Sequence, residues 1–170
     1  MVVVRSPIAY GDLRSIDTAT AAQMPGIDAV WTSADIADIP EIPFRATRVK
    51  GLDPYRQPVL ARDVVRYVGE PIAAVFAQSA RAAEDAAELV ILETDDRDAL
   101  LDACDLPREF TYGHTTEPTI VRKAYGNVDT AIAAADHCLE LDLAIGRHSA
   151  VPLETRGAIA CYDHTSDHLD

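Results

Sequence analysis

The alternation of apolar and polar residues is clearest between Val64 and Val90, where the chain reads VVRYVGEPIAAVFAQSARAAEDAAELV. β-Branched and aromatic residues fill the start, residues 69–71 interrupt them, and a second short apolar run extends to Phe76. After Ser79, whose side-chain oxygen can cap a helix, alanines recur at helical spacing with charged residues between them. The pattern predicts two strands joined by a tight turn and then an amphipathic helix.

A similar alternation of short strands and helices precedes this segment. The predicted elements are an extended segment over 2–16, a short helix over 18–23, a strand over 29–32 and a helical turn over 33–36. Residues 38–63 then contain four prolines and little periodicity. We expect an irregular segment on the surface there, in a place suited to contact with a partner.

The composition changes after the alanine-rich helix and divides the chain into two bodies. Residues 94–117 are rich in Asp and are typical of a solvated linker. A cation site among these aspartates is disfavoured, because no glycine-containing calcium-loop pattern is present. Beyond the linker, the pattern predicts a strand over 120–125, a helix over 128–135 capped by Asn127, and strands over 137–145 and 157–162. The fold class is therefore α+β.

Composition and charge narrow the range of functions. The chain has 170 residues, of which 48% are hydrophobic, enough for a packed core. It has 15 basic and 28 acidic residues, which disfavours nucleic acid or an anionic membrane as a partner. The apolar run at residues 2–4 is far shorter than a signal-peptide core, and no later run approaches a membrane span. We expect a cytoplasmic protein without nucleic-acid or membrane contacts.

Cysteine and histidine spacing does not favour a metal site. Cys104, Cys138 and Cys161 are widely spaced, so they form neither a CxxC pair nor a full set of ligands for an iron–sulfur cluster. We expect reduced thiols packed as small apolar groups. His164 and His168 stand four apart, a spacing that suits zinc on a helix, but their surroundings are polar and lack a third ligand.

The segment RHSAVPLETR contains the densest polar cluster within an otherwise apolar stretch. Its members are Arg147, His148, Glu154 and Arg156. A carboxylate beside two guanidinium groups can orient a ligand or a cofactor phosphate. The same residue types also form ionic networks that brace the join between two domains. The bracing role is favoured, so these four residues are weak candidates for cofactor contact, and no catalytic residue is assigned.

Four sequence blocks occur in a characteristic order along the chain. They are VVRSPIAYGDLRSIDTATAAQMPGIDAVWTSADI, PVLARDVVRYVGEPIAAVFAQSARAAEDAAELV, GNVDTAIAAADHCLELDL and RHSAVPLETRGAIACYD. Their order and spacing resemble the large subunit of molybdenum hydroxylases of the xanthine dehydrogenase, aldehyde oxidase and aerobic carbon monoxide dehydrogenase family. The resemblance implies an α/β hammerhead domain, a mixed sheet with packed helices, over 1–102. It also implies a linker over 103–118 and an incomplete first segment of a β-rich molybdopterin-binding domain over 119–170.

The resemblance also implies which parts of such a subunit this chain lacks. In the family, later segments build the molybdenum pocket: a glutamine-bearing strand, a glycine-rich loop and a glutamate that acts as base. Because none of these occurs before Asp170, we expect an N-terminal portion of the subunit that is inactive by itself. No cofactor is expected on this segment alone. A molybdopterin-type molybdenum cofactor belongs to the complete subunit, with iron–sulfur clusters and FAD on partner subunits or domains.

Two functional classes remain open at this point. In the first, the chain has a structural role in an oxidoreductase that hydroxylates an aldehyde, an N-heterocycle or a similar small substrate with water. Its partners would be the remainder of the molybdenum subunit and the iron–sulfur and FAD subunits, with substrate bound only in the full complex. In the second, it is a non-catalytic, stand-alone or degenerate hammerhead module for protein interaction. Resemblance of fold does not identify the substrate.

Overall fold

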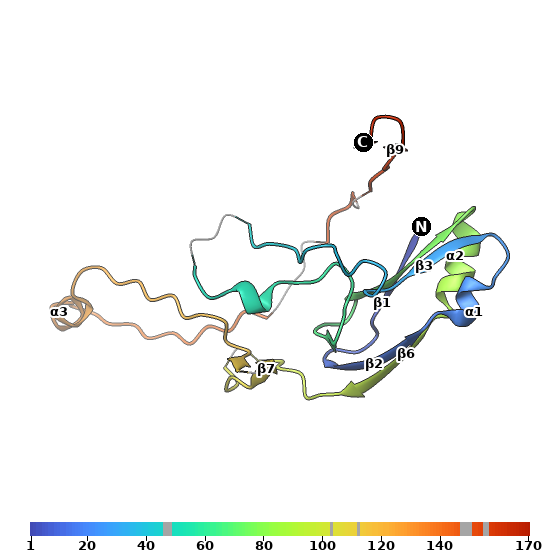
Figure 1. Ribbon diagram of the computed structural model, residues 1–170. Coiled ribbons are helices and arrows are strands. Elements are labelled where there is room, and N and C mark those ends of the chain that lie inside the picture. The colour runs from blue at the N-terminus through green and yellow to red at the C-terminus, as the bar shows by residue number, and fades with distance from the viewer. Residues whose placement is uncertain (46–48, 103, 112, 147–150, 155–156) are drawn as a thin grey trace. The chain divides into compact units, whose positions relative to one another are not determined.

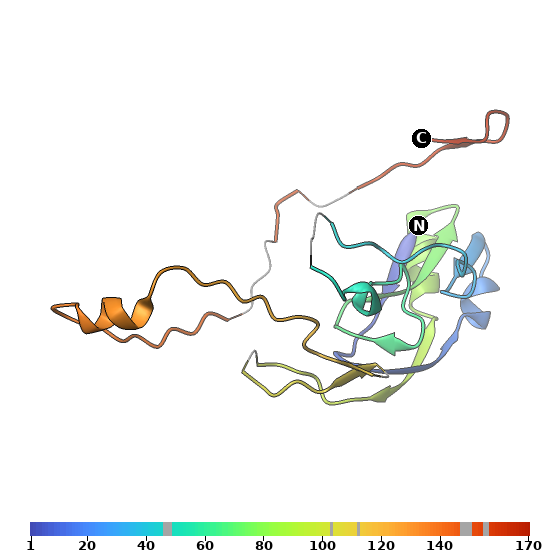
Figure 2. The same ribbon diagram turned by 60° about the vertical axis from the view of Figure 1, so that its left-hand side comes forward.

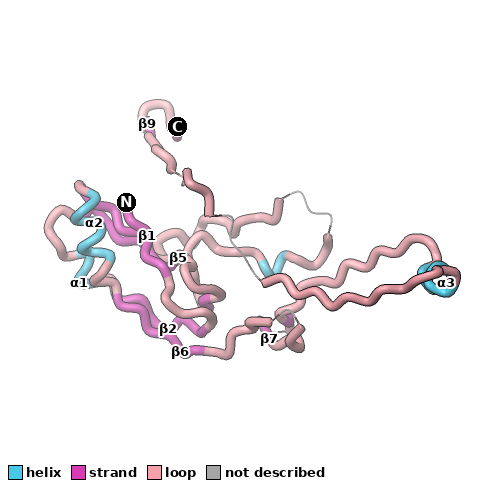
Figure 3. The backbone as a smooth tube through the Cα atoms, turned by 180° about the vertical axis from the view of Figure 1, so that it is seen from behind, coloured by secondary structure: helices cyan, strands magenta, loops and turns pink. Residues whose placement is uncertain are grey.

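The computed structural model describes residues 1–45, 49–102, 104–111, 113–146, 151–154 and 157–170. The chain divides into two compact units, Met1–Arg122 and Lys123–Asp170. The first unit contains two three-stranded sheets and two short α-helices (Figures 1 and 2). The described part of the second unit is mostly loop, coloured pink in Figure 3, with one helix and one short hairpin.

The first sheet has the strand order β1-β5-β3, and both pairings are antiparallel. Its strands are β1 (Val2–Arg5), β5 (Pro71–Ala77) and β3 (Ile27–Trp31). In the central strand, Val75 pairs with Val2 on one side and with Val30 on the other. The apolar run predicted as a strand is therefore the middle of this sheet, which explains why it carries so few polar residues.

Helices α1 (Ala19–Ala22) and α2 (Ala80–Ala87) lie side by side against this sheet (Figure 1). Ala83 and Ala86 of α2 are fully buried together with Ala21 and Val75. Small side chains let the helix backbone approach the sheet closely, as the sequence predicts. The Ser79 hydroxyl accepts a 3.2 Å hydrogen bond from the Ala82 amide, which confirms the predicted helix cap.

The second sheet has the strand order β4-β2-β6. Its strands are β4 (Val64–Val65), β2 (Gly11–Asp17) and β6 (Ile91–Asp96). Val65 and Ile72 are buried beside Ala61, so the second core cluster connects β4 to β5 of the first sheet. The strands before and after the predicted tight turn thus belong to different sheets.

Two segments outside the sheets have some regular structure. Residues 38–63 are irregular, as predicted, apart from the 3-10 helix η1 (Asp53–Tyr55) and one isolated bridge between Ile42 and Gln57. In the acidic stretch, β6 extends to Asp96, and β7 (Glu109–Thr111) pairs with β8 (His114–Thr115). The stretch predicted as a solvated linker therefore contains some strand structure, because pairing with β2 accommodates the start of the acidic run.

In the second unit, α3 (Val128–Ala133) begins at Asn127, whose side chain accepts a 3.0 Å hydrogen bond from the Thr130 amide. Strands β9 (Tyr162–Asp163) and β10 (His168–Leu169) form a hairpin. The strands predicted over 120–125 and 137–145 do not form, and only the last residue of the strand predicted over 157–162 lies in one. The alternating apolar residues there remain exposed because no described strand pairs with them.

Candidate functional site

The Arg66–Glu70 ion pair is the most enclosed charged contact in the described part of the chain. The Arg66 Nε donates a 2.8 Å hydrogen bond to the Glu70 carboxylate, and the Arg66 Nη2 and backbone amide donate to it as well. The Glu70 side chain is 1% exposed. The Arg66 Nη1 donates a 3.2 Å hydrogen bond to the Arg56 carbonyl. This pair holds the turn between β4 and β5 in place.

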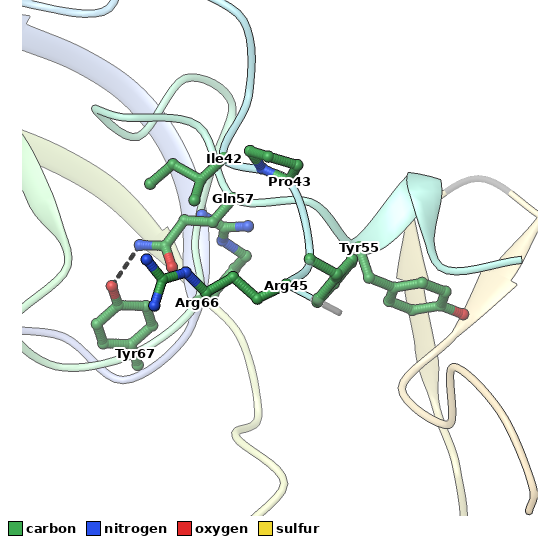
Figure 4. A pocket seen from close by; sticks show the side chains of 8 residues that line it. Ile42, Pro43, Arg45, Tyr55, Gln57, Arg66 and Tyr67 are labelled. Atoms are coloured by element: carbon green, nitrogen blue, oxygen red, sulfur yellow. Dashed lines mark hydrogen bonds between the residues drawn. The ribbon is translucent and has the colours of Figure 1, made fainter. Parts of the chain in front are cut away.

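A pocket of about 330 Å³, here called the loop pocket, lies beside this ion pair (Figure 4). Its apolar lining residues are Ile42, Pro43 and Phe44. Its polar and aromatic lining residues are Arg45, Tyr55, Gln57, Arg66 and Tyr67. The pocket belongs to the first unit and is formed by the irregular segment together with the residues that follow β4.

Hydrogen bonds define the shape of the loop pocket. The Ile42 amide donates a 2.8 Å bond to the Gln57 carbonyl, which holds the two limbs of the irregular segment together. The Gln57 side chain donates to the Tyr67 hydroxyl at 2.5 Å, drawn as a dashed line in Figure 4. Tyr55 points away from the other labelled side chains. It stacks on Phe110 at 5.3 Å between ring centroids, and its hydroxyl donates to the Thr115 carbonyl.

The chemistry of the loop pocket is suited to binding rather than to acid–base catalysis. Its lining includes Arg45, Arg66 and the Tyr67 phenol, whereas the Tyr55 hydroxyl is turned away towards Thr115. None of its lining residues is a carboxylate, histidine or cysteine. Within the described ranges, no group of three or more His, Cys, Asp or Glu side chains comes together to hold a metal ion. An anionic group with an apolar neighbour would fit these walls best.

The structure describes only one of the four candidate residues in the C-terminal polar cluster. Arg147, His148 and Arg156 lie outside the described residues, and Glu154 is exposed. All described residues from 123 to 170 are exposed, so they form no enclosed cradle that would fit a pterin cofactor. The four residues therefore stay predicted candidates, and no chemical step is assigned to them.

The structure describes all three cysteines and both histidines of the C-terminal pair. Cys104, Cys138 and Cys161 are free but exposed, so the expectation that they pack as buried groups was wrong. His164 and His168 lie in the β9–β10 hairpin instead of on a helix face. The His164 ring contacts Tyr162, and the His168 Nε2 lies 3.2 Å from the Asp170 carboxylate.

Sequence reasoning missed the Arg66–Glu70 pair. The available signal was an Arg and a Glu four residues apart with Gly69 between them, where the backbone turns with φ of 89°. The sequence alone does not show that the carboxylate is buried, because burial depends on the tertiary fold. In the part of the chain that the structure describes, no helix is long and apolar enough to cross a membrane.

Comparison with known proteins places these features in a family. Residues 1–98, more than half of the chain, match the family model for the aldehyde oxidase and xanthine dehydrogenase a/b hammerhead domain. The chain belongs to the aldehyde oxidase and xanthine dehydrogenase family. Residues 112–170 match the model for the molybdopterin cofactor-binding domain. Both the family resemblance and the α+β hammerhead fold predicted from the sequence are confirmed.

Relatives within the aldehyde oxidase and xanthine dehydrogenase family are much longer than this chain. It is 41% identical over 174 residues to the nicotine 6-hydroxylase large subunit of Paenarthrobacter nicotinovorans, covering 98% of this chain and 21% of the relative. It is 35% identical over 176 residues to the 6-hydroxypseudooxynicotine dehydrogenase complex subunit gamma of the same organism, covering 99% and 22%. The crystal structure of quinoline 2-oxidoreductase from Pseudomonas putida 86 superposes with a TM-score of 0.78 at 32% identity, covering 99% and 22%. The chain thus spans about a fifth of the length of these relatives.

Proposed function

We propose that this chain supplies the hammerhead domain and the opening segment of the molybdopterin-binding domain of a molybdenum hydroxylase large subunit. One observation carries the proposal: a single chain matches both family models, in that order and over nearly its whole length. The proposed boundaries are a hammerhead domain over 1–102, a linker over 103–118 and the start of the molybdopterin-binding domain over 119–170. A cytoplasmic location is part of the same proposal.

The proposed reaction of the complete enzyme is hydroxylation of a small substrate by water. A C–H bond and a water molecule give a C–OH group, two protons and two electrons. The electrons leave through iron–sulfur clusters and FAD on partner subunits or domains, and a bound molybdenum cofactor supplies the oxidising centre. The role of this chain is to support that centre: its two buried clusters fix the sheets of the hammerhead domain. Arg147, His148, Glu154 and Arg156 remain candidates for bracing it or contacting the cofactor.

For the substrate class, we propose a compound with a pyridine-type ring. The names of the two relatives at 41% and 35% identity refer to nicotine and to 6-hydroxypseudooxynicotine, which both contain such a ring. Quinoline, named for the matched crystal structure, contains one as well. Over nearly the whole chain, relatives named for xanthine and for carbon monoxide share 30% and 28% identity. Two further relatives named for xanthine share 38% identity, but over only 53% of the chain. The similarity over nearly the whole chain therefore favours a pyridine-type ring over a purine, an aldehyde or carbon monoxide.

The proposal is tested on the complex purified through a tag on this chain from its native host. Nicotine, quinoline, xanthine and carbon monoxide are offered with an artificial electron acceptor in ¹⁸O-labelled water. We expect labelled hydroxylated product from a pyridine-type ring, and no turnover from the 170-residue chain produced alone. Oxygen derived from O₂, or no hydroxylation of any substrate by the complex, would contradict the proposed reaction. Turnover by the isolated chain would contradict the proposed division of roles.

A further inference from the structure

We propose that the loop pocket is a docking site for an acidic segment of a partner polypeptide, one that carries an apolar side chain next to its carboxylates. The inference concerns assembly, and it holds whether or not the redox reaction proposed above is the right one. It rests on the charge of residues 45–66, on the exposed apolar residues around the pocket and on the contacts that hold the pocket in shape.

The segment that builds the pocket is basic in an acidic protein. Residues 45–66 contain six Lys or Arg residues and two Asp residues, whereas the whole chain has a formal net charge of −13. A basic surface attracts an acidic partner segment, whereas the negatively charged remainder of the chain repels such a segment. Charge complementarity therefore argues for a partner segment rich in Asp or Glu.

Part of this positive charge is available for a partner. Arg66 is neutralised by Glu70, and Arg56 by Asp53 at 2.5 Å. In contrast, no carboxylate forms an ion pair with Arg45 or Lys50 among the described residues. Arg45 lines the pocket itself, so a carboxylate entering there would meet a guanidinium group without an internal counter-ion.

Large apolar and aromatic side chains of the pocket lining are also exposed to solvent. Ile42 is 51% exposed, Phe44 44% and Tyr67 43%. Exposed Phe, Tyr and Arg side chains are typical of the centres of protein–protein interfaces. The volume of about 330 Å³ suits one large apolar side chain. A partner segment could place a carboxylate against Arg45 and a neighbouring apolar side chain in the loop pocket. It would then match both the charged and the apolar parts of the pocket lining.

Two features favour a polypeptide over a free small anion or a nucleic acid. Ile39, Val59 and Val68 are exposed near the pocket in sequence, and covering them needs an extended partner. A nucleic acid needs a row of cations along its phosphates, and Glu70 and Asp53 already engage two of the arginines here. The Ile42–Gln57 and Gln57–Tyr67 hydrogen bonds hold the pocket in one shape, which lowers the entropic cost of docking.

Photo-crosslinking in the native host tests the identity of the partner segment. The tagged full chain carries p-benzoylphenylalanine in place of Phe44, and a matched control carries it in place of Arg81, an exposed residue of α2. We expect the probe at position 44 to crosslink another polypeptide within an Asp/Glu-rich peptide that contains an apolar residue, and the probe at 81 not to. A crosslink to a neutral or basic peptide or to nucleic acid, or no crosslink between chains at 44, would overturn the proposal.

A charge reversal then tests the role of Arg45. Arg45→Glu in the chain that carries the probe at 44 should lower the yield of the crosslink about tenfold, as expected when one charge pair becomes repulsive. Arg81→Glu makes the same change in net charge on α2 and should leave the yield unchanged. An unchanged yield with Arg45→Glu, or an equal fall with both variants, would overturn the charge-based part of the proposal. Arg45 makes no described ion pair, so its variant is expected to fold.

Discussion

Arg66 and Glu70 form a multiply hydrogen-bonded ion pair across the turn that joins the two sheets of the first unit. Glu70 is among the most buried side chains of the described residues, and Arg66 is 16% exposed. Backbone hydrogen bonds from Ser6 to the Glu70 carbonyl and from Gly69 to the Ser6 carbonyl join the same turn to the end of β1. The turn is therefore fixed by its own side chains and by a neighbouring strand.

Removing the carboxylate of this pair should destabilise the fold strongly. Glu70→Ala leaves the Arg66 guanidinium partly buried without a counter-ion, and we expect a loss of about 3 kcal/mol in the free energy of unfolding. Urea denaturation followed by circular dichroism measures this value. Asp85→Ala is the matched control, because its contact with Arg81 is long and exposed. That variant should change stability by less than about 0.5 kcal/mol, and equal losses in both would contradict the account.

The cap of helix α2 offers a second test. Ser79→Ala removes the acceptor of the Ala82 amide, and we expect a loss of about 1 kcal/mol. Thr18 occupies the corresponding position before α1 but makes no side-chain capping hydrogen bond. Thr18→Ala should therefore be close to neutral in the same denaturation experiment. A neutral Ser79→Ala variant would show that the cap does not stabilise this helix.

Gly11 lies where β2 approaches β6 too closely for a larger side chain. A methyl group at this position would lie 2.8 Å from the Asp95 carbonyl oxygen and 2.8 Å from the Ile8 Cδ1. Because a backbone oxygen cannot move aside easily, Gly11→Ala should cost about 1 to 3 kcal/mol of unfolding free energy. Gly157→Ala, in open space, is the control and should be nearly neutral. A Gly11→Ala variant as stable as the control would refute the close approach.

The stability of the β9–β10 hairpin should depend on pH through the Asp163 carboxyl. Hydrogen bonds from the Ser166 hydroxyl, and then from the Thr165 amide, lower the pKa of the Asp163 carboxyl. Since the folded pKa is depressed, the stabilisation is complete above the ordinary Asp pKa of about 3.9 and is lost as pH falls through the folded pKa. An NMR titration of this carboxyl should show Ser166→Ala raising its pKa and Ser166→Thr preserving the lowered value. An unchanged pKa in Ser166→Ala would contradict the assignment of the cause.

Local patterns allowed the first unit to be predicted well. The alanine spacing and Ser79 predicted α2, and the apolar run to Phe76 predicted β5, because both depend on residues close in sequence. The prediction of strands over 120–125 and 137–145 was wrong, because strand formation depends on residues that are distant in sequence. Their alternation gives a suitable apolar face, but a strand also needs a partner, and the sequence of the strand itself does not show whether one exists.

The candidate site was predicted only in outline. The prolines of residues 38–63 indicated an irregular surface segment suited to contact, and the loop pocket is formed there. The sequence did not predict which residues line the loop pocket. Gln57 pairs with Ile42 and Tyr67, and the Glu70 carbonyl accepts a hydrogen bond from the Ser6 amide, so these contacts join residues that lie apart in the sequence.

The central claim is that this chain is part of a molybdenum hydroxylase, and the metal content of its complex tests that claim most directly. The complex is purified through a tag on the 170-residue chain from its native host, and molybdenum, iron and flavin are quantified against the tagged chain. We predict that all three co-purify in a fixed ratio to the chain through successive chromatography steps. A folded chain that purifies with its partners but without molybdenum would contradict the claim.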